Sequence, residues 1–137
     1  MRCSPNLTGA ATAVAVLALV AAAPARADHH TVQVSKEGKV GAHLADAKGS
    51  TLYVFKKDAP GKSACAGGCV AKWPLFYREE VAAGPGLKAS DFGTLTRDDG
   101  QKQSTYKGMP LYYFAGDKAP GDAKGDKVGD VWFVAAP

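Results

Sequence analysis

The sequence predicts a mainly β protein, a small antiparallel sandwich or barrel-like sheet built from two duplicated halves with pseudo-two-fold symmetry. Three observations predict this fold. Short segments rich in branched and aromatic residues recur along the chain, and Gly, Pro and Asp separate them. Convincing helical periodicity is absent. A ten-residue segment also recurs 59 residues further along the chain, as expected for a duplication.

Residues 1–27 have the pattern of a cleavable secretory signal peptide. A basic residue precedes an apolar run over residues 10–23, and Ala25-Arg26-Ala27 has the small-x-small form that signal peptidase accepts. Cys3 precedes the apolar run, so it does not have the place of a lipid-bearing first residue. We therefore expect residues 28–137 to form a single β-rich domain that is periplasmic or secreted, with no transmembrane anchor after processing.

Eight segments of the mature chain are predicted strands, because branched or aromatic residues dominate them. In chain order they are Thr31–Ser35, Gly41–Ala45, Thr51–Lys56, Trp73–Tyr77, Phe92–Thr96, Gln103–Tyr106, Leu111–Phe114 and Val131–Ala135. Arg97-Asp98-Asp99-Gly100 is a predicted hairpin tip, because Asp-Gly supports the positive φ of such turns. A short helical turn is expected only within Ala64–Lys72 or Glu79–Ala83.

The duplication defines two internal repeats, at about 49–75 and 108–134. Gly49–Asp58 aligns with Gly108–Asp117, and five of these ten positions are identical, where chance gives about one match or fewer. The same offset places one tryptophan on the other without a gap. The repeat-motif residues are Tyr53, Phe55, Asp58 and Trp73 in the first repeat, and Tyr112, Phe114, Asp117 and Trp132 in the second.

Alternation along a strand predicts how the first motif is buried. Tyr53 and Phe55 should share one face, with Leu52 and Val54 on the other. We expect the aromatic rings to fill the core and Asp58, like its counterpart, to hold a turn. The alternative is an aromatic surface shared by the two halves, with the carboxylates at its rim.

Tyr53–Asp58 and Tyr112–Asp117 both fit the pattern Tyr-x-(Phe/Trp/Tyr)-x-x-Asp. This doublet resembles the family of predicted bacterial lipoproteins, also described as secreted repeats of unknown function, that is named for the motif. The resemblance covers about residues 38–137. It includes the short motifs Ser63-Ala-Cys65 with Cys69, Trp73-Pro74, Thr96–Gly100, Gln103-x-Thr105-Tyr106, Pro110-Leu111-Tyr112 and Gly129-x-x-Trp132. Many members carry a lipobox and this chain does not, so the resemblance implies a free periplasmic or secreted protein, with no established activity.

The two cysteines of the mature chain, Cys65 and Cys69, predict a structural disulfide, because a close pair in an oxidising compartment is most simply bonded. A thioredoxin-like redox motif has two residues between its cysteines, whereas this pair has three. Val70 occupies the place that a histidine takes in covalent haem attachment. A structural zinc site would need a second pair of ligands nearby.

Two segments carry candidate metal ligands. After cleavage, the amine of Asp28, two amide nitrogens and the imidazole of His30, with His29 between them, can surround Cu(II) in a square plane. This possible Cu(II) site at the mature N-terminus is the only cofactor expectation with a defined ligand set. The aspartates of 117–130 offer oxygens to calcium, but they lack EF-hand spacing, and a solvated loop is expected there.

We expect a non-enzymatic cell-envelope binding or structural module. Charges are interspersed, with 15 Lys and Arg against 13 Asp and Glu once the signal peptide is removed, so nucleic acid is not an expected partner. Hydrolase and zinc-protease motifs are absent, and His43, in a predicted strand, is expected to be half-buried rather than a general base. The partner could be an envelope protein, a glycan or a small molecule. The alternative is a periplasmic metal (copper) or electron-transfer accessory protein.

Overall fold

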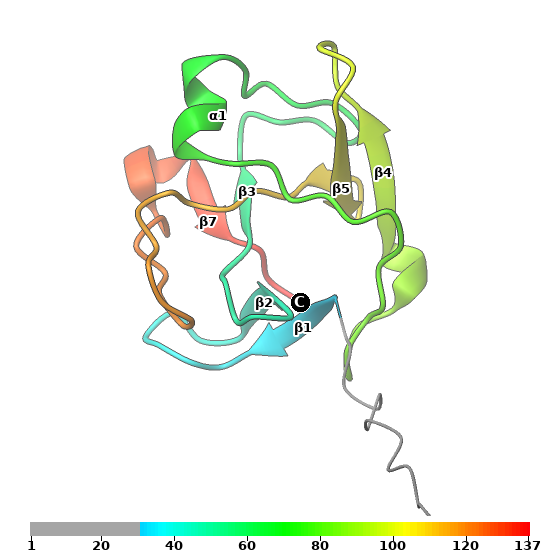
Figure 1. Cartoon of the computed structure of the whole chain (residues 1–137). Coiled ribbons are helices and arrows are strands. Elements are labelled where there is room, and N and C mark those ends of the chain that lie inside the picture. Colours follow the sequence, from blue (N-terminus) through cyan, green and yellow to red (C-terminus); the bar gives the residue numbers. More distant parts are fainter. Residues whose placement is uncertain (1–30) are drawn as a thin grey trace, which may run out of the picture.

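The computed structural model describes residues 31–137 of the chain, which form a mainly β structure with little helix (Figure 1). The strands are β1 (Val32–Ser35), β2 (His43–Asp46), β3 (Tyr53–Phe55), β4 (Phe92–Thr96), β5 (Lys102–Tyr106), β6 (Met109–Pro110) and β7 (Trp132–Val134). The helical elements are α1 (Gly68–Lys72) and the single 3-10 turns η1 (Ala89–Asp91) and η2 (Val128–Asp130).

The strands form three small antiparallel sheets, with orders β1-β2, β3-β7 and β4-β5-β6. Isolated bridges, such as the antiparallel bridge between Ala45 and Thr51, link segments outside these ladders. Over residues 31–137 no barrel closes, so the barrel-like alternative is wrong. Closure requires a continuous hydrogen-bonded ladder from each strand to the next, whereas these strands have two to five residues and end in turns.

The predicted β4–β5 hairpin is confirmed. The Arg97 amide donates to the Gln101 carbonyl at 2.8 Å, and Gly100 adopts a φ of 84°. That positive φ requires a residue without a Cβ clash, which explains the Asp-Gly at the tip. The helical turn within Ala64–Lys72 is also confirmed as α1, whereas Glu79–Ala83 contains no helix.

Two predicted strands, Trp73–Tyr77 and Leu111–Phe114, are wrong as regular strands. The two segments lie side by side but form only one isolated antiparallel bridge, between Leu75 and Tyr112. Pro74 contributes to the break, because it has no amide hydrogen to donate to a ladder. Its carbonyl still accepts the Tyr113 amide at 2.7 Å.

The core has two clusters, and the predicted alternation of β3 separates them. Leu52 and Val54 pack in an aliphatic cluster whose buried members are Val32, Leu44, Leu52, Phe76, Tyr106, Leu111 and Ala135. Tyr53 and Phe55 pack in an aromatic cluster whose buried members are Tyr53, Phe55, Cys65, Trp73, Tyr112 and Trp132. A single strand thus contributes to both clusters, because successive side chains point to opposite faces.

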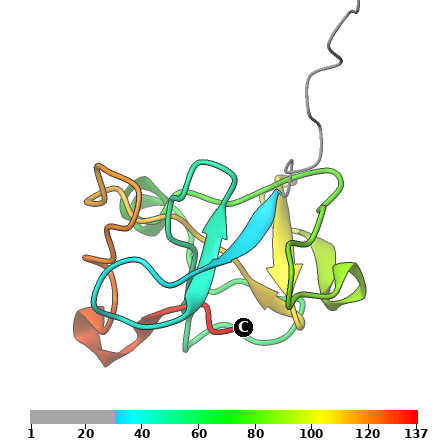
Figure 2. The ribbon, with the colours of Figure 1, turned by 90° about the horizontal axis from the view of Figure 1, so that it is seen from below.

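The C-terminal end of the chain returns to the N-terminal strands, as Figures 1 and 2 show from two directions. The Leu44 amide in β2 donates to the Ala135 carbonyl at 2.8 Å, and the Ala135 amide donates to the Leu52 carbonyl at 2.9 Å. The last residues therefore close the aliphatic cluster. No helix in the described part of the chain is long and apolar enough to cross a membrane.

Equivalent backbone contacts join the two repeats. Tyr53 and Tyr112 exchange both hydrogen bonds of an antiparallel bridge, at 2.8 and 3.0 Å. A second matched pair of bonds lies on either side of this bridge: Lys56 N–H to Val131 O (2.7 Å) and Ala115 N–H to Lys72 O (2.9 Å). The residue that follows the Tyr-x-Phe motif in each repeat thus bonds the residue just before the tryptophan of the other repeat.

Candidate functional site

Four aromatic rings of the repeat motif form a continuous stack in the interior. Trp73 and Trp132 lie face to face, with ring centroids 3.8 Å apart and an interplanar angle of 5°. Phe55 stacks on Trp132 at 4.2 Å, and Phe114 packs on Trp73 at 4.5 Å. The tryptophans are only 4% and 5% exposed and Phe55 is 9% exposed, so these three rings fill the core, while Phe114 at the end of the stack is half-buried.

The tyrosine of each repeat donates a hydrogen bond to the aspartate of the other. Tyr53 Oη donates to Asp117 Oδ2 at 2.5 Å, and Tyr112 Oη donates to Asp58 Oδ2 at 2.7 Å. Phenol-to-carboxylate bonds of this length are charge-assisted and stronger than neutral ones. The motif residues that lie 64 and 54 positions apart are therefore brought together in crossed pairs.

The second carboxylate oxygen of each aspartate holds the loop that follows it. Asp58 Oδ1 accepts the Ala64 amide at 2.6 Å, and Asp117 Oδ1 accepts the Lys124 amide at 2.9 Å. Such carboxylate-to-amide bonds fix loop backbones that would otherwise be solvated. The aspartates therefore hold turns, as the sequence predicts.

Burial shifts the pKa values of both pairs in the same direction. Desolvation raises the pKa of Asp58 and the pKa of Asp117, although their tyrosine and amide donors pull in the opposite direction. Burial, together with the Asp58 carboxylate, raises the pKa of Tyr112 to about 12, and burial and Asp117 raise the pKa of Tyr53 further. Both phenols therefore remain protonated donors at neutral pH.

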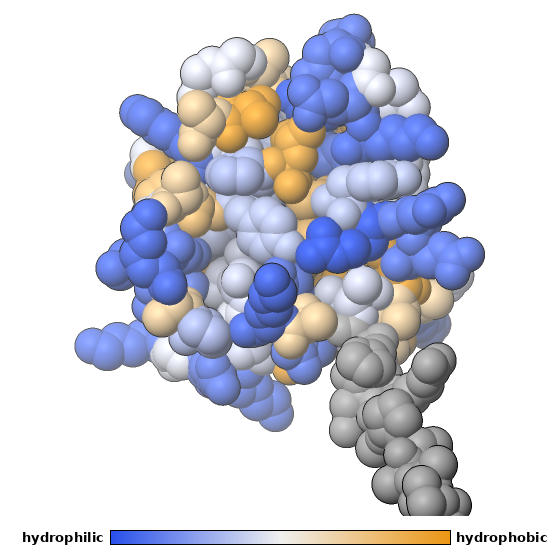
Figure 3. Space-filling view, in the orientation of Figure 1, coloured by the Kyte–Doolittle hydropathy of each residue, from blue (hydrophilic) through white to orange (hydrophobic). Residues whose placement is uncertain are grey.

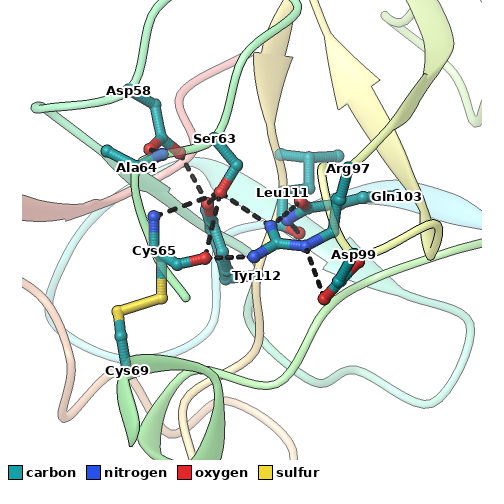
Figure 4. Close-up of a disulfide and its surroundings, with 10 residues drawn as sticks. All are labelled: Asp58, Ser63, Ala64, Cys65, Cys69, Arg97, Asp99, Gln103, Leu111 and Tyr112. Atoms are coloured by element: carbon teal, nitrogen blue, oxygen red, sulfur yellow. Dashed lines mark hydrogen bonds and ion pairs between the residues drawn. A yellow bond between two sulfur atoms is a disulfide. The ribbon is translucent and has the colours of Figure 1, made fainter. Parts of the chain in front are cut away.

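A buried arginine joins only the Tyr112–Asp58 pair (Figure 4). Arg97 Nη1 donates to Ser63 Oγ and to Gln103 Oε1, both at 2.7 Å, and Nη2 donates to the Cys65 carbonyl. Ser63 Oγ lies 2.5 Å from Tyr112 Oη. The guanidinium is thereby linked through Ser63 to the tyrosine–aspartate pair.

Arg97 also borders a surface pocket of about 600 Å³, lined by 61–63, Ala66 and 95–99. Its side chain is 4% exposed, and within residues 31–137 its Nε has no hydrogen-bond partner. The Oδ2 atom of Asp99, a half-exposed side chain, lies 3.8 Å from this nitrogen, which is too far for a hydrogen bond. The pocket therefore adjoins a buried cation whose Nε forms an ion pair with Asp99 but makes no hydrogen bond within residues 31–137.

The sequence alone does not indicate a site around Arg97. It predicts only a hairpin tip there, where an arginine is normally solvated. A signal did exist, because Ser63, Arg97 and Gln103 all fall in motifs shared with the resembling family. Their convergence depends on contacts between residues 6 to 34 positions apart.

The predicted disulfide is confirmed, with Cys65 and Cys69 bonded and their Cα atoms 5.4 Å apart. Cys65 is 1% exposed and packs in the aromatic cluster. The bond joins the turn before α1 to Cys69 within α1 (Figure 4), and Ala66, between the two cysteines, lines the pocket. It therefore supports the backbone carbonyl that Arg97 contacts.

His43 is fully buried, which corrects the expectation of a half-buried strand histidine. Its Nδ1 lies 2.8 Å from the Gly41 carbonyl, and its Nε2 lies 3.3 Å from Thr51 Oγ1. Both ring nitrogens thus have partners within the protein. Burial is deeper than expected because β2 is enclosed along its whole length, as its four residues are all buried.

The candidate metal ligands are placed as follows. In the loop over residues 117–130, Asp122 Oδ2 accepts the amides of Lys118 and Ala119 at 2.9 and 3.0 Å, so it holds its own turn. Among the described residues, no group of three or more His, Cys, Asp or Glu side chains could hold a metal ion. Residues 1–30 lie outside the described part, so the signal peptide and the Cu(II) site at Asp28, His29 and His30 stay predictions.

These observations define a small β protein in which two interlocked repeats enclose an aromatic core. The chain belongs to a family described as a secreted repeat of unknown function, whose pattern matches residues 34–76 and 93–136. The predicted family is therefore confirmed, and the two matches begin 59 residues apart, which is the offset of the duplicated motif. The description agrees with a secreted or periplasmic location. Neither the curated proteins nor the solved structures provide a match.

Proposed function

We propose that this protein is a non-enzymatic binding module of the cell envelope, and that its ligand occupies the pocket beside Arg97. The observation that carries the proposal is this pocket of about 600 Å³, bordered by a buried guanidinium whose Nε has no hydrogen-bond partner among residues 31–137. Its volume lies within the range of about 300–1,000 Å³ typical of small-molecule sites. The disulfide and the turn that Asp58 holds support one wall of the pocket.

The chemistry of the lining favours a neutral, polar ligand. Lys62 and Arg97 supply positive charge, and Asp98 and Asp99 supply negative charge, so the lining is balanced. Hydroxyl groups and short apolar side chains complete the walls. A hydroxyl-rich glycan unit or an uncharged peptide segment matches such alternating donors and acceptors better than a polyanion does.

The scaffold of this module is inferred to be two halves related by an approximate two-fold rotation. The support is reciprocal: each tyrosine bonds the opposite aspartate, and each tryptophan packs on the opposite phenylalanine. The Trp73–Trp132 contact would lie on the axis. Superposition of an experimental structure on itself after exchange of the repeats tests this relation.

Site-specific photocrosslinking in the native envelope tests the binding site. A photoreactive residue at Lys62, in the pocket, should give one discrete adduct, whereas the same residue at the exposed Lys88 should not. Thr96→Trp should fill the pocket and abolish the adduct. Thr94→Trp is the matched control, because Thr94 is also exposed on β4 but does not line this pocket.

Two results would contradict the proposal. The first is equal crosslinking from positions 62 and 88, which would indicate non-specific contact. The second is an adduct from position 62 that survives Thr96→Trp, which would place the ligand outside the pocket. Far-UV circular dichroism of each variant establishes that the fold is retained.

A further inference from the structure

We propose that the stacked Trp73–Trp132 pair, together with the two flanking tyrosine–aspartate pairs, forms a relay for one-electron oxidation through the protein. The inference rests on ring geometry and hydrogen bonds in the core and is independent of the proposed ligand pocket. Its chemical partner is a one-electron oxidant that takes an electron from the tryptophan pair. Burial of the rings as core residues does not by itself explain why each tyrosine donates its hydrogen bond to a carboxylate.

The tryptophan pair is the suitable site for initial electron loss. Indole is readily oxidised among the side chains, and the two rings overlap face to face at 3.8 Å with an angle of 5°. Overlap at this distance lets the rings share a positive charge, which makes electron loss easier than from a single indole. The negative face of a neighbouring aromatic ring also attracts positive charge, and Phe55 and Phe114 cover the outer faces of the pair.

Each tryptophan has a tyrosine at its edge that can return an electron to the oxidised tryptophan pair. Tyr53 meets Trp73 at a centroid distance of 5.4 Å, and Tyr112 meets Trp132 at 5.1 Å. Both pairs are nearly perpendicular, at 77° and 89°. Electron transfer between rings in contact needs no intermediate group.

Oxidation of a phenol requires loss of its proton, and here each phenol already points at a carboxylate. The distances are 2.5 Å for Tyr53 to Asp117 and 2.7 Å for Tyr112 to Asp58. Both phenolic rings are fully buried, and the carboxylate is the strongest base in hydrogen-bond contact with each phenolic oxygen. Burial raises the pKa of each of these carboxyl groups, so a transferred proton is retained better there than on a solvated aspartate.

For the Tyr112–Asp58 pair, electron loss and proton transfer occur in this order. The oxidant removes one electron from the tryptophan pair, which becomes a radical cation. Tyr112 then gives an electron to the pair and its phenolic proton to Asp58 Oδ2, leaving neutral tryptophans, a neutral tyrosyl radical and a carboxylic acid. A one-electron reductant returns an electron to the tyrosyl oxygen, and Asp58 returns the proton. Tyr53 and Asp117 perform the same step on the other side.

The chain contains its own matched control. Tyr113 Oη donates to Asp46 Oδ2 at 2.7 Å, the same kind of pair at the same distance. Its ring contacts Phe76, at 5.6 Å, rather than a tryptophan. Tyr113 therefore has the proton acceptor but lacks the electron acceptor, and it should take no part in the relay.

Flash photolysis of the folded, disulfide-bonded protein tests the relay. Photogenerated tris(bipyridine)ruthenium(III) serves as the oxidant, and transient absorption distinguishes tryptophan from tyrosyl radicals. In the unmodified protein, a tryptophan radical should form first and decay as a tyrosyl radical grows. The tyrosyl radical should form more slowly in D₂O, because the phenolic proton moves in the same step as the electron.

Variants separate the relay from a purely structural role. Tyr53→Phe with Tyr112→Phe should lose the secondary tyrosyl growth and prolong the tryptophan radical, whereas Tyr113→Phe should leave both unchanged. Asp58→Asn with Asp117→Asn should slow the growth and remove its D₂O effect. Near-UV circular dichroism checks that the variants keep the aromatic packing, and the D₂O comparison needs no variant at all.

Three outcomes would overturn the proposal. One is a tryptophan radical that decays without tyrosyl growth in the unmodified protein. Another is identical kinetics in the Tyr53→Phe/Tyr112→Phe protein and the unmodified one. The third is an equal loss of signal in Tyr113→Phe, which would show that any tyrosine serves and that the stacked pair has no special role.

Discussion

The two tyrosine–aspartate pairs share their hydrogen bonds but differ in their surroundings. Beside Tyr112 and Asp58 lie Ser63, Arg97 and the disulfide, with the pocket next to them. The corresponding Tyr53 accepts a hydrogen bond from the Gly125 amide at 3.2 Å, and no arginine within residues 31–137 bonds to it or to Asp117. Duplication therefore preserved the aromatic centre, while the loops that follow the aspartates became different.

One position shows how the loops diverged. The residue after the amide that bonds the aspartate is Cys65 in the first loop and Gly125 in the second. A Cβ atom at Gly125 would lie 2.8 Å from the Trp73 ring, so glycine is required there. Cys65 instead turns its side chain into the aromatic cluster and bonds to Cys69. The first loop is thus closed covalently, and the second by close backbone approach.

Figure 3 shows one face of the molecule, which is largely hydrophilic, with small apolar areas between α1 and the β4–β5 hairpin. The only large hydrophobic side chain that is clearly exposed among residues 31–137 is Val128, at 40%. An extended apolar docking face is therefore not part of the described surface. The surroundings of the two tyrosine–aspartate pairs differ instead in polar residues, such as those near Arg97.

The largest expected effect is from removal of the arginine that is linked to only one of the two tyrosine–aspartate pairs. Arg97→Ala should lower the free energy of unfolding by about 3 kcal/mol or more, because Gln103 and the Cys65 carbonyl lose a buried charged donor. Lys124→Ala, at an exposed side chain in the loop that Asp117 holds, should stay within about 0.5 kcal/mol of the unmodified protein. Urea denaturation measures both; equal losses would show that Arg97 contributes nothing particular.

The disulfide gives the next largest difference between the loops. Replacing both cysteines by alanine should cost about 2 kcal/mol and leave the fold intact, because so short a closed loop restricts the unfolded chain only moderately. Amide hydrogen exchange should become faster over residues 61–67 and remain unchanged over 121–126, the corresponding loop. Faster exchange in both loops would mean that the bond stabilises the whole domain rather than one half.

The smallest effect concerns pH, where the halves should behave alike. Burial raises the folded-state pKa of Asp58 and of Asp117 above the unfolded value of about 3.9. The folded state then binds protons more readily, so these groups make stability rise as pH falls from the raised folded pKa towards 3.9. Asp58→Asn and Asp117→Asn should each remove part of this rise, and the double variant should remove both parts.

Measurement of urea midpoints across this pH window tests the prediction. The informative feature is the sign of the change in urea midpoint with pH. A carboxylate whose hydrogen-bond donors lower its folded-state pKa would make stability fall, not rise, as the pH falls. A rise that persists in full in the double variant would assign it to other groups. A change confined to Asp58→Asn would show that Arg97 alters the titration of one half only.

The sequence by itself determined the local features of this protein. The offset of 59 residues revealed two repeats, and alternation in Tyr53–Phe55 predicted which side chains share a face. The Asp-Gly hairpin and the Cys65–Cys69 bond also followed from neighbouring residues. These features are readable because turn conformations and strand alternation depend on residues close together in the chain.

Only the tertiary structure decided which repeat each motif residue contacts. Nothing in the motif states that Tyr53 bonds Asp117 instead of Asp58, because that choice depends on how the halves dock. The same docking stacks Trp73 on Trp132. It also buries Arg97 at the base of a hairpin whose sequence predicts a solvated turn, since Ser63 and the Cys65 carbonyl approach it from another loop. Long-range packing, not local pattern, therefore produced both the pocket and the aromatic relay.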